Sequence, residues 1–432
     1  MNSADTAWML ISTALVLLMT PALAFFYGGL VRSKNALNTM MMSFISLGFV
    51  GVLWALIGYS LALSPGNNWL GDLSFAFLNN VGLSEKGAVV ALTIPHTLYM
   101  VFQATFCIIT AALISGAIVE RMNFKAYLLF ISLWSVVVYA PLAHWVWGAG
   151  WLADMGAWDF AGGTVVHVNA GIAAFVAALV VGKRSDYGKA GLLPHNVPTV
   201  LLGAGLLWFG WFGFNAGSAL AASPIAGLAF TTTMLAPAGT LVVWTFLDLM
   251  RSGKPTAVGC ATAIVVGLVA ITPAAGFVSP MNGLILGAIA AVPSYLGLMI
   301  RAKTSLDDSL DVVAAHGVGG TVGAILTGVF AQKALNGVFD GALYGNLGQV
   351  GIQALAVGTA IVYSGGMSFI LLKLIALVLP LRATASEEST GLDLTMHGEE
   401  AYLHTGGFDA VLSPAEATRA EGATASSPVV VR

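Results

Sequence analysis

The chain has 432 residues, of which 58% are hydrophobic and only 9% carry a charged side chain. Because average proteins are about 25% charged, this composition excludes a soluble globular protein and predicts an integral membrane protein. A net charge of −3 and the lack of any Lys/Arg run exclude a nucleic-acid binder that relies on phosphate neutralisation.

The first apolar segment raises the question of a signal peptide, since residues 22–24 (Ala-Leu-Ala) resemble a small-residue cleavage site. A signal peptide needs a positively charged start, whereas residues 1–7 contain Asp5 and no Lys or Arg. The apolar run also continues as far as Arg32. We therefore predict that residues 7–31 form the first membrane-spanning helix.

The rest of the chain is organised as a series of further apolar segments. A helix crosses the hydrocarbon layer of a bilayer with about 20 residues. The charged or Pro/Gly/Asn-rich breaks divide the sequence into eleven such helices, at residues 7–31, 38–63, 96–119, 125–148, 160–182, 198–221, 225–250, 256–275, 281–300, 309–331 and 349–380. We predict an all-α integral membrane protein with a transmembrane domain at 1–380 and a tail at 381–432. Beyond residue 412 the composition predicts disorder.

The distribution of basic residues predicts the orientation in the membrane. An odd number of spans places the two termini on opposite sides. If the N-terminus is outside, all Lys and Arg residues except Lys86, Lys333 and Lys373 fall on the inner side. The positive-inside rule therefore predicts a multi-pass protein of the cell membrane with its N-terminus outside and its C-terminus in the cytoplasm.

Two histidines lie at matched positions in the fifth and tenth predicted spans. Asp159 precedes His167 by eight residues, and Asp308 precedes His316 by eight. At 1.5 Å per residue, both histidines lie about 12 Å in from opposite faces of a core about 30 Å thick. This pattern predicts an inverted repeat of spans 1–5 and 6–10, with a site where the halves meet.

The histidines and the aspartates call for different interpretations. Ionisable residues inside a membrane are costly, so each is a functional candidate until a partner explains it. An interior His can simply tie helices together, but a matched pair favours a proton path, because imidazole exchanges protons near neutral pH. For Asp159 and Asp308 we favour a structural role, in which each carboxylate caps the first free N–H groups of its helix and adds negative potential. Nearby glycines allow close helix approach, at Gly317, Gly319, Gly320 and Gly323.

Five residues are predicted at similar depth near the outer face, namely Phe102, Phe106, Trp147, Phe214 and Ser218. Aromatic faces attract small cations, with Trp the best, and a serine hydroxyl can accept a hydrogen bond from the cation. The alternative is that Trp147 belongs to an interfacial aromatic belt and that the phenylalanines are ordinary packing residues. Their convergence with the histidine pair favours an outer cation site.

Several motifs resemble those of the ammonium transporter family. Residues 159–167 (DFAGGTVVH) with 182–184 (GKR) are similar to its signature. Further similar segments are 102–106 (FQATF), 210–218 (GWFGFNAGS), 316–318 (HGV), 391–394 (GLDL) and 397–399 (HGE). The resemblance covers about residues 5–404, although residues 312–315 differ from the usual family form.

The resemblance implies a homotrimer of eleven-helix subunits with one pore in each. It implies an outer ammonium site formed by Trp147, Phe102 and Ser218, a gate formed by Phe106 and Phe214, and a twin-histidine pair formed by His167 and His316. Trp211 and Phe26 are further candidates for the pore wall. The resemblance also implies an ordered tail that contacts the neighbouring subunit, and a P-II-type signalling protein as a regulator at the cytoplasmic face.

We therefore predict an ammonium transporter that selects NH4+ outside, removes its proton and conducts NH3, with the proton following the histidines. Methylammonium is a further candidate substrate. The alternatives are an electroneutral ammonia channel and an ammonium sensor with little flux. An intramembrane enzyme needs a nucleophile or metal constellation, and neither the sparse acidic residues nor Cys107 and Cys260, in separate apolar segments, supply one. We predict no cofactor and no metal.

Overall fold

The computed structural model describes residues 1–189 and 191–402 as helices joined by loops. In this part of the chain no β-strand forms, and only two isolated bridges pair Gly66 with Gly71 and Met122 with Arg382. Ten of the described helices are long and apolar enough to cross a membrane, and Ala257–Ile271 is a shorter apolar helix. The all-α membrane fold predicted from the sequence is confirmed. The tail beyond residue 412 lies outside the described residues.

The first five predicted spans correspond to helices in the first 181 residues. They are α1 (Ser3–Leu30), α2 (Ala36–Leu53) with α3 (Tyr59–Leu63), α4 (His96–Ile114), α5 (Phe124–Trp134) with α6 (Ala140–Trp147), and α8 (Asn169–Val181). Turns of π-helix join α2 to α3 and α5 to α6 and lead into α8, at Trp54–Gly58, Ser135–Tyr139 and Gly163–Val168. The short helix α7 (Trp151–Asp154) follows α6.

The other six predicted spans form the second part of the chain. They are α9 (Val197–Gly217), α10 (Pro224–Ser252), α11 (Ala257–Ile271), α12 (Pro280–Arg301), α13 (Gly319–Phe330) and α15 (Gly348–Ile375). A π-helical turn, Val313–Val318, leads into α13. The short helices are α14 (Lys333–Asn336) and, in the tail, α16 (Ala385–Thr390), followed by a last π turn at Asp393–His397. The fifth and tenth spans thus begin three or four residues later than predicted, and each begins with a π turn.

Local chemistry explains where several of these helices begin. The side chains of Asn2, Asn123 and Asn196 accept backbone N–H groups at the starts of α1, α5 and α9. Ser223 and Ser279 do the same for α10 and α12, where a proline occupies the first helical position. These caps satisfy N–H groups that have no partner within the helix, which is why Asn, Ser and Thr are favoured there.

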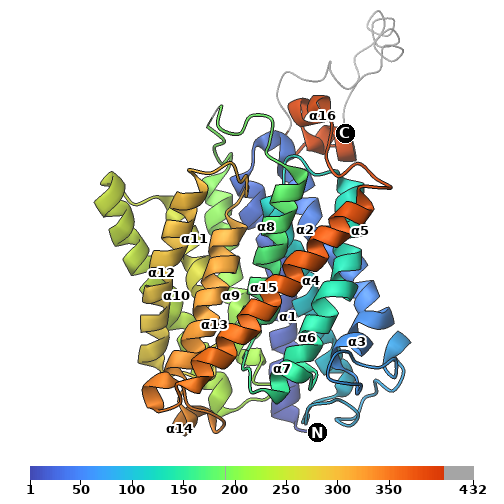
Figure 1. The fold of residues 1–432 in the computed structure, drawn as a ribbon, viewed down its shortest axis with the longest axis vertical. Coiled ribbons are helices and arrows are strands. Elements are labelled where there is room, and N and C mark those ends of the chain that lie inside the picture. Colours follow the sequence, from blue (N-terminus) through green and yellow to red (C-terminus); the bar gives the residue numbers. More distant parts are fainter. Residues whose placement is uncertain (190, 403–432) are drawn as a thin grey trace, which may run out of the picture.

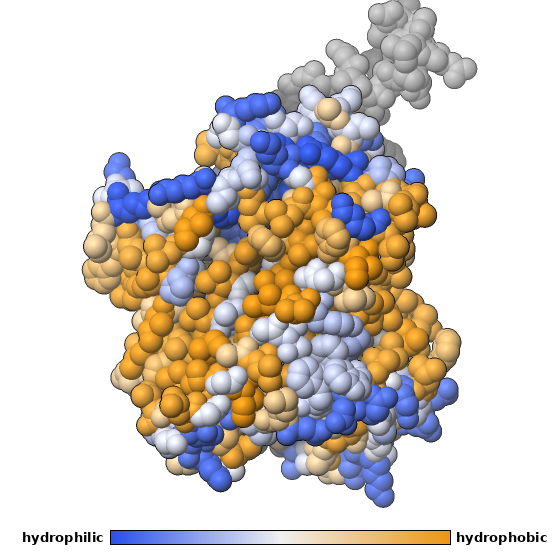
Figure 2. Space-filling model, in the orientation of Figure 1, coloured by the Kyte–Doolittle hydropathy of each residue, from blue (hydrophilic) through white to orange (hydrophobic). Residues whose placement is uncertain are grey.

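The helices form one bundle whose two ends differ (Figure 1). The chain starts at the lower end, here called the N-terminal face, and α16 lies at the upper end, here called the C-terminal face. Helix α1 packs along α9, the first helix of the second half, and α15 runs diagonally across α13, α8 and α5. On the side of the molecule in view, Figure 2 shows mostly hydrophobic residues across the middle and hydrophilic residues toward both faces, as expected for a protein that spans a bilayer.

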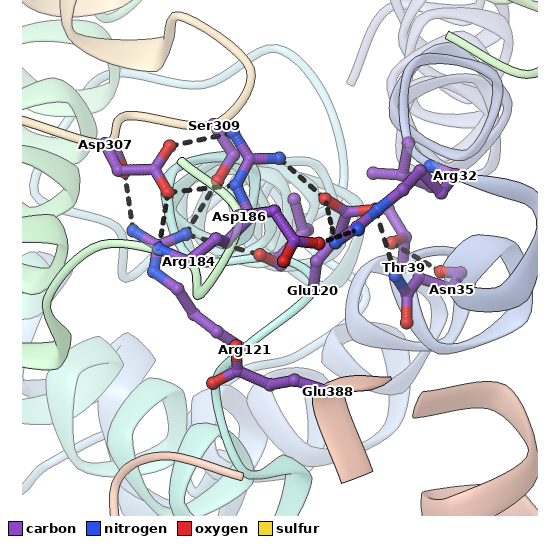
Figure 3. A network of polar contacts seen from close by, with 12 residues as sticks. Arg32, Asn35, Thr39, Glu120, Arg121, Arg184, Asp186, Asp307, Ser309 and Glu388 are labelled. Atoms are coloured by element: carbon purple, nitrogen blue, oxygen red, sulfur yellow. Dashed lines mark hydrogen bonds and ion pairs between the residues drawn. The ribbon is translucent and has the colours of Figure 1, made fainter. Parts of the chain in front are cut away.

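A buried ionic network ties the helix ends together at the C-terminal face (Figure 3). Glu120, which follows α4, pairs with Arg32 after α1 at 2.9 Å and with Arg184 after α8 at 2.6 Å. Arg184 also pairs at 2.8 Å with Asp307, which follows α12. Burial alone would raise the pKa of Glu120, but the two arginines lower it to about 2. The network therefore joins the first and second halves of the chain through charges that compensate one another.

The first part of the tail packs against the same face of its own chain. Glu388 of α16 accepts hydrogen bonds from Ser185 and Arg382. Asp393 accepts the backbone N–H groups of Leu37 at 3.0 Å and Asn38 at 2.7 Å, at the start of α2. The carboxylate thus caps a helix that begins more than 350 residues earlier in the sequence.

Candidate functional site

The two predicted histidines lie in contact at the centre of the bundle. His167 belongs to the π turn before α8 and His316 to the π turn before α13, and both are almost fully buried. Their Nδ1 atoms are 3.2 Å apart. A hydrogen bond between two imidazole nitrogens requires that one donates and the other accepts, so the pair can hold its shared proton on either ring. The Nε2 atom of His167 has no hydrogen-bond partner among the described residues.

Two glycines explain how the π turns approach so closely. Gly171 follows His167 by four residues, and a Cβ atom there would lie 2.3 Å from the backbone nitrogen of Gly317. Gly320 follows His316 by four residues, and a Cβ atom there would lie 2.9 Å from Cβ of His167. Each of these distances is shorter than real Cβ atoms allow. The glycine on each helix therefore gives the other half room to bring its histidine into contact.

The two aspartates hold the start of each π turn. The carboxylate of Asp159 accepts four backbone N–H groups at 2.7–3.0 Å, from Gly162, Gly163, Thr164 and Val165. Asp308 accepts two, from Val312 at 3.1 Å and Val313 at 2.7 Å. A carboxylate satisfies the free N–H groups of a helix start and favours its positive end. These contacts fix the backbone that carries the histidines.

A cavity of about 420 Å³ lies between this site and the N-terminal face. It is lined by Trp147 and Ser218, two of the residues predicted for the outer cation site, together with Phe106 and Asp159. The indole Nε1 of Trp147 donates to the backbone oxygen of Asp159 at 2.8 Å, which fixes the ring. Ser218 donates its hydroxyl hydrogen to the backbone oxygen of Phe214 at 2.8 Å, so the lone pairs of its oxygen remain available to a cation.

Phe102, the third residue predicted for that site, lies behind Phe106 and is fully buried. The two rings meet edge to face with centroids 4.9 Å apart. The wall of the cavity is completed by residues that sequence reasoning did not single out, including Tyr99, Gln103, Trp158 and Phe160. Tyr99 and Gln103 precede Phe106 on α4 at helical spacing, and Trp158 and Phe160 flank Asp159.

The two residues predicted as a gate lie at the inner end of this cavity, on the side of the histidines. The rings of Phe106 and Phe214 stack with centroids 4.2 Å apart and an interplanar angle of 21°. Phe214 also lies 6.0 Å from the ring of His167. The stacked pair therefore separates the N-terminal cavity from the histidines, and its faces carry no hydrogen-bonding group.

A narrow cavity of about 10 Å³ lies beyond the gate. This space is about enough for one water molecule, and its wall includes both histidines, Trp211 and Phe26. The ring of Trp211 stacks on His167 at 5.4 Å, and its Nε1 donates to Thr272 Oγ1 at 2.9 Å. Phe214 also lines this cavity. The remaining wall is aliphatic, and sequence reasoning did not identify its residues, which are Met19, Leu23, Ile109, Leu113, Val166, Leu207 and Val265.

A third cavity of about 290 Å³ lies on the C-terminal face and includes Arg184 and Asp311 in its wall. Two helices carry wall residues from the narrow cavity into this one. On α1, Leu30 follows Phe26 by four residues, and on α11, Thr262 precedes Val265 by three. The spacing of three or four residues on α1 and α11 places these residues on one face of each helix, and this helical periodicity could have identified them from the sequence. The walls of the narrow cavity and of the third cavity thus continue into one another along α1 and α11.

The described residues include no group of three or more His, Cys, Asp or Glu side chains placed to hold a metal ion.

Comparisons with known proteins agree on one family. Residues 7–402 match the model described as Ammonium Transporter Family. An ammonium transporter of Bacillus subtilis (strain 168) is 48% identical over 404 residues, covering 93% of this chain and 99% of that protein. The crystal structure of Mep2 from Saccharomyces cerevisiae is similar with a TM-score of 0.83 and 35% identity, covering 89% of this chain and 88% of that one. A structure named Sensor Amt Protein is similar with a TM-score of 0.84 and 30% identity, covering 91% and 98%.

Proposed function

The chain belongs to the ammonium transporter family, and from this premise we propose that it binds NH4+ in the N-terminal cavity, removes the proton and conducts NH3 past the two histidines. The observation that carries the proposal is the order of the cavities between the two faces. A wide aromatic cavity is followed by the stacked Phe106–Phe214 pair, a space for one small molecule beside His167 and His316, and an exit cavity.

Recruitment of the cation fits the chemistry of the N-terminal cavity. The faces of Trp147 and Phe106 attract a small cation, and the oxygen of Ser218 can accept one of its hydrogen bonds. Phe102 supports the ring of Phe106 from behind. The buried carboxylate of Asp159 adds negative potential beside the cavity.

Deprotonation follows from the narrow part of the path. A charged ion that loses its hydration there would meet aliphatic walls without oxygen ligands, so NH4+ and K+ both face a high barrier. Neutral NH3 needs far less solvation. The histidine pair offers the only titratable side chains in the wall of the narrow cavity, and its shared hydrogen bond can pass a proton on while NH3 follows. This relay separates the proposed mechanism from an electroneutral ammonia channel.

The proposal extends to the setting of the protein. We propose that the N-terminal face lies outside and the C-terminal face in the cytoplasm, as the basic residues predict. Substrates would be ammonium and methylammonium, the assembly a homotrimer, and the C-terminal face a docking surface for a P-II-type signalling protein. The transmembrane domain would end at about residue 380, shortly after the end of helix α15 at Ile375.

The test is an ammonium jump on purified protein in liposomes, with current and internal pH recorded together across external pH and against K+. A saturable current that is lost in His167→Ala and His316→Ala supports the relay. Unchanged current and selectivity in both variants would refute it, and a pH change without current would identify an electroneutral ammonia channel. No response of either kind would favour a sensor, the function that the name of one structural neighbour gives to that protein.

A further inference from the structure

An amphipathic groove lies beside the exit cavity of the path, and the two share Arg301 in their walls. It has a volume of about 340 Å³ and lies between α8 and α12. Phe175 and Leu179 of α8 form one wall, and Gly297 and Ile300 of α12 form the other. Leu179 and Ile300 are more than half exposed, at 57% and 64%. Both belong to helices long and apolar enough to cross a membrane, so we expect an acyl chain or another protein to cover them.

The floor of this groove is the π turn that carries His316. Val313, Ala314 and Val318 line it, and the turn contacts both α8 and α12. At Gly297 a Cβ atom would lie 3.4 Å from Cβ of Ala314, so the missing side chain keeps the groove deep. Whatever fills the groove therefore touches the backbone segment that positions one member of the histidine pair.

The end of the groove at the C-terminal face is polar and positively charged. Arg301, Thr304 and Ser305 line this end. Arg301 contacts Asp311 through one terminal nitrogen at 2.7 Å, while its Nε–H has no hydrogen-bond partner among the described residues. An unpartnered guanidinium N–H is costly to bury, and it suits a phosphate oxygen, which Arg binds with strong directional hydrogen bonds.

Two lysines add to the positive charge at this end. Lys183 and Lys303 are exposed and come directly after the C-terminal ends of α8 and α12, the helices that form the walls. The acidic residues nearby are engaged, because Asp307 pairs with Arg184 and Asp308 accepts backbone N–H groups. A basic end above an apolar groove at the level of the membrane surface is the arrangement that recognises anionic lipids.

From this combination we propose that the α8–α12 groove binds an anionic phospholipid of the leaflet on the C-terminal face. The headgroup phosphate accepts hydrogen bonds from Arg301 and is attracted by the two lysines. One acyl chain lies along Leu179 and Ile300 and reaches the π turn of His316. The site holds a structural lipid beside the transport path, and the lipid takes no part in the path itself.

Binding is tested on the full chain in detergent by titrating phosphatidylglycerol or phosphatidylcholine and following thermal stabilisation and native mass spectra. We expect saturable binding of phosphatidylglycerol that is at least tenfold tighter than that of phosphatidylcholine. Arg301→Gln and Gly297→Leu, which fills the groove, should each weaken it at least tenfold. Lys125→Gln, at an exposed lysine on the same face at the start of α5, should change it less than twofold.

Arg301→Lys keeps a positive charge opposite Asp311 but replaces the guanidinium and its Nε donor with an ammonium group, so it tests the proposal even if Arg301→Gln fails to fold. Equal affinity for the two lipids, or unchanged binding in Gly297→Leu, would overturn the proposal. Displacement by millimolar inorganic phosphate would show a free anion as the ligand, and cross-linking through Ile300→Cys in two subunits would show a second copy as the occupant. Because binding is measured without transport, a negative result here leaves the proposed function untouched.

Discussion

The aspartates before the two π turns differ in the number of hydrogen bonds that they accept, and this difference predicts unequal effects on stability. Asp159 accepts four backbone N–H groups and Asp308 accepts two. Replacing either residue with alanine leaves these N–H groups buried without an acceptor. A hydrogen bond to a charged group contributes about 1.5 kcal/mol or more. We therefore expect Asp159→Ala to lower the free energy of unfolding by about 6 kcal/mol and Asp308→Ala by about 3 kcal/mol.

The measurement is unfolding of each purified variant in one detergent, at a pH where both carboxylates are ionised. Asp159→Asn provides a matched control, because it keeps one side-chain oxygen as an acceptor and should fall between wild type and Asp159→Ala. In liposomes, Asp159→Ala should also lose ammonium current even where it remains folded, since the turn that carries His167 is no longer fixed. Equal losses for the two alanine variants, or a loss below about 2 kcal/mol for Asp159→Ala, would refute the argument from bond number.

Four further predictions rest on the packing and the charges. Glu120→Gln should cost about 3–5 kcal/mol in unfolding free energy because it leaves the buried Arg184 and the partly buried Arg32 undercompensated. Asp186→Asn, at a half-exposed partner of Arg32, should cost less than about 1 kcal/mol. Because the folded-state pKa of Glu120 is about 2, below its ordinary 4.5, its contribution is complete above about pH 4.5 and should be lost in pH-dependent unfolding as the pH falls toward 2. Gly171→Ala should push the two histidines apart and abolish ammonium current, and a current equal to wild type would show that the contact is dispensable. Phe106→Ala removes half of the stacked gate and should allow K+ to compete with ammonium in the current assay, whereas intact selectivity would place the barrier at the histidines alone.

The sequence was sufficient to predict the helices and the central pair because both have simple periodic causes. Each span needs about 20 apolar residues, and the repeated Asp-to-His spacing of eight residues marks the same element in both halves. The glycine cluster after His316 likewise indicated a close helix approach, and Gly320 lies against His167. These features are local, so they can be read without knowing the tertiary structure.

Features that depend on long-range contacts were not predictable in the same way. Nothing local indicates that the fifth and tenth spans begin as π turns, since the extra residue in each turn is accommodated by contacts with the other half. The position of Phe102 behind Phe106 depends on the rotation of α4 in the bundle. The contact of Asp393 with the start of α2 joins segments more than 350 residues apart, and no pattern in the tail specifies that partner.

The distribution of polar groups fits the proposed removal of a proton from the transported cation. Charged side chains that hold the fold lie at the two faces, where Glu120 and Asp159 are each compensated by arginines or by backbone N–H groups. Within the narrow cavity, the imidazoles are the only groups that can change charge. A permanent charge there would stabilise an ion and slow its release, whereas a neutral pair with one shared proton gives NH3 a partner without trapping it. The ion pairs at the faces and the weak polarity of the centre therefore both fit the proposed function.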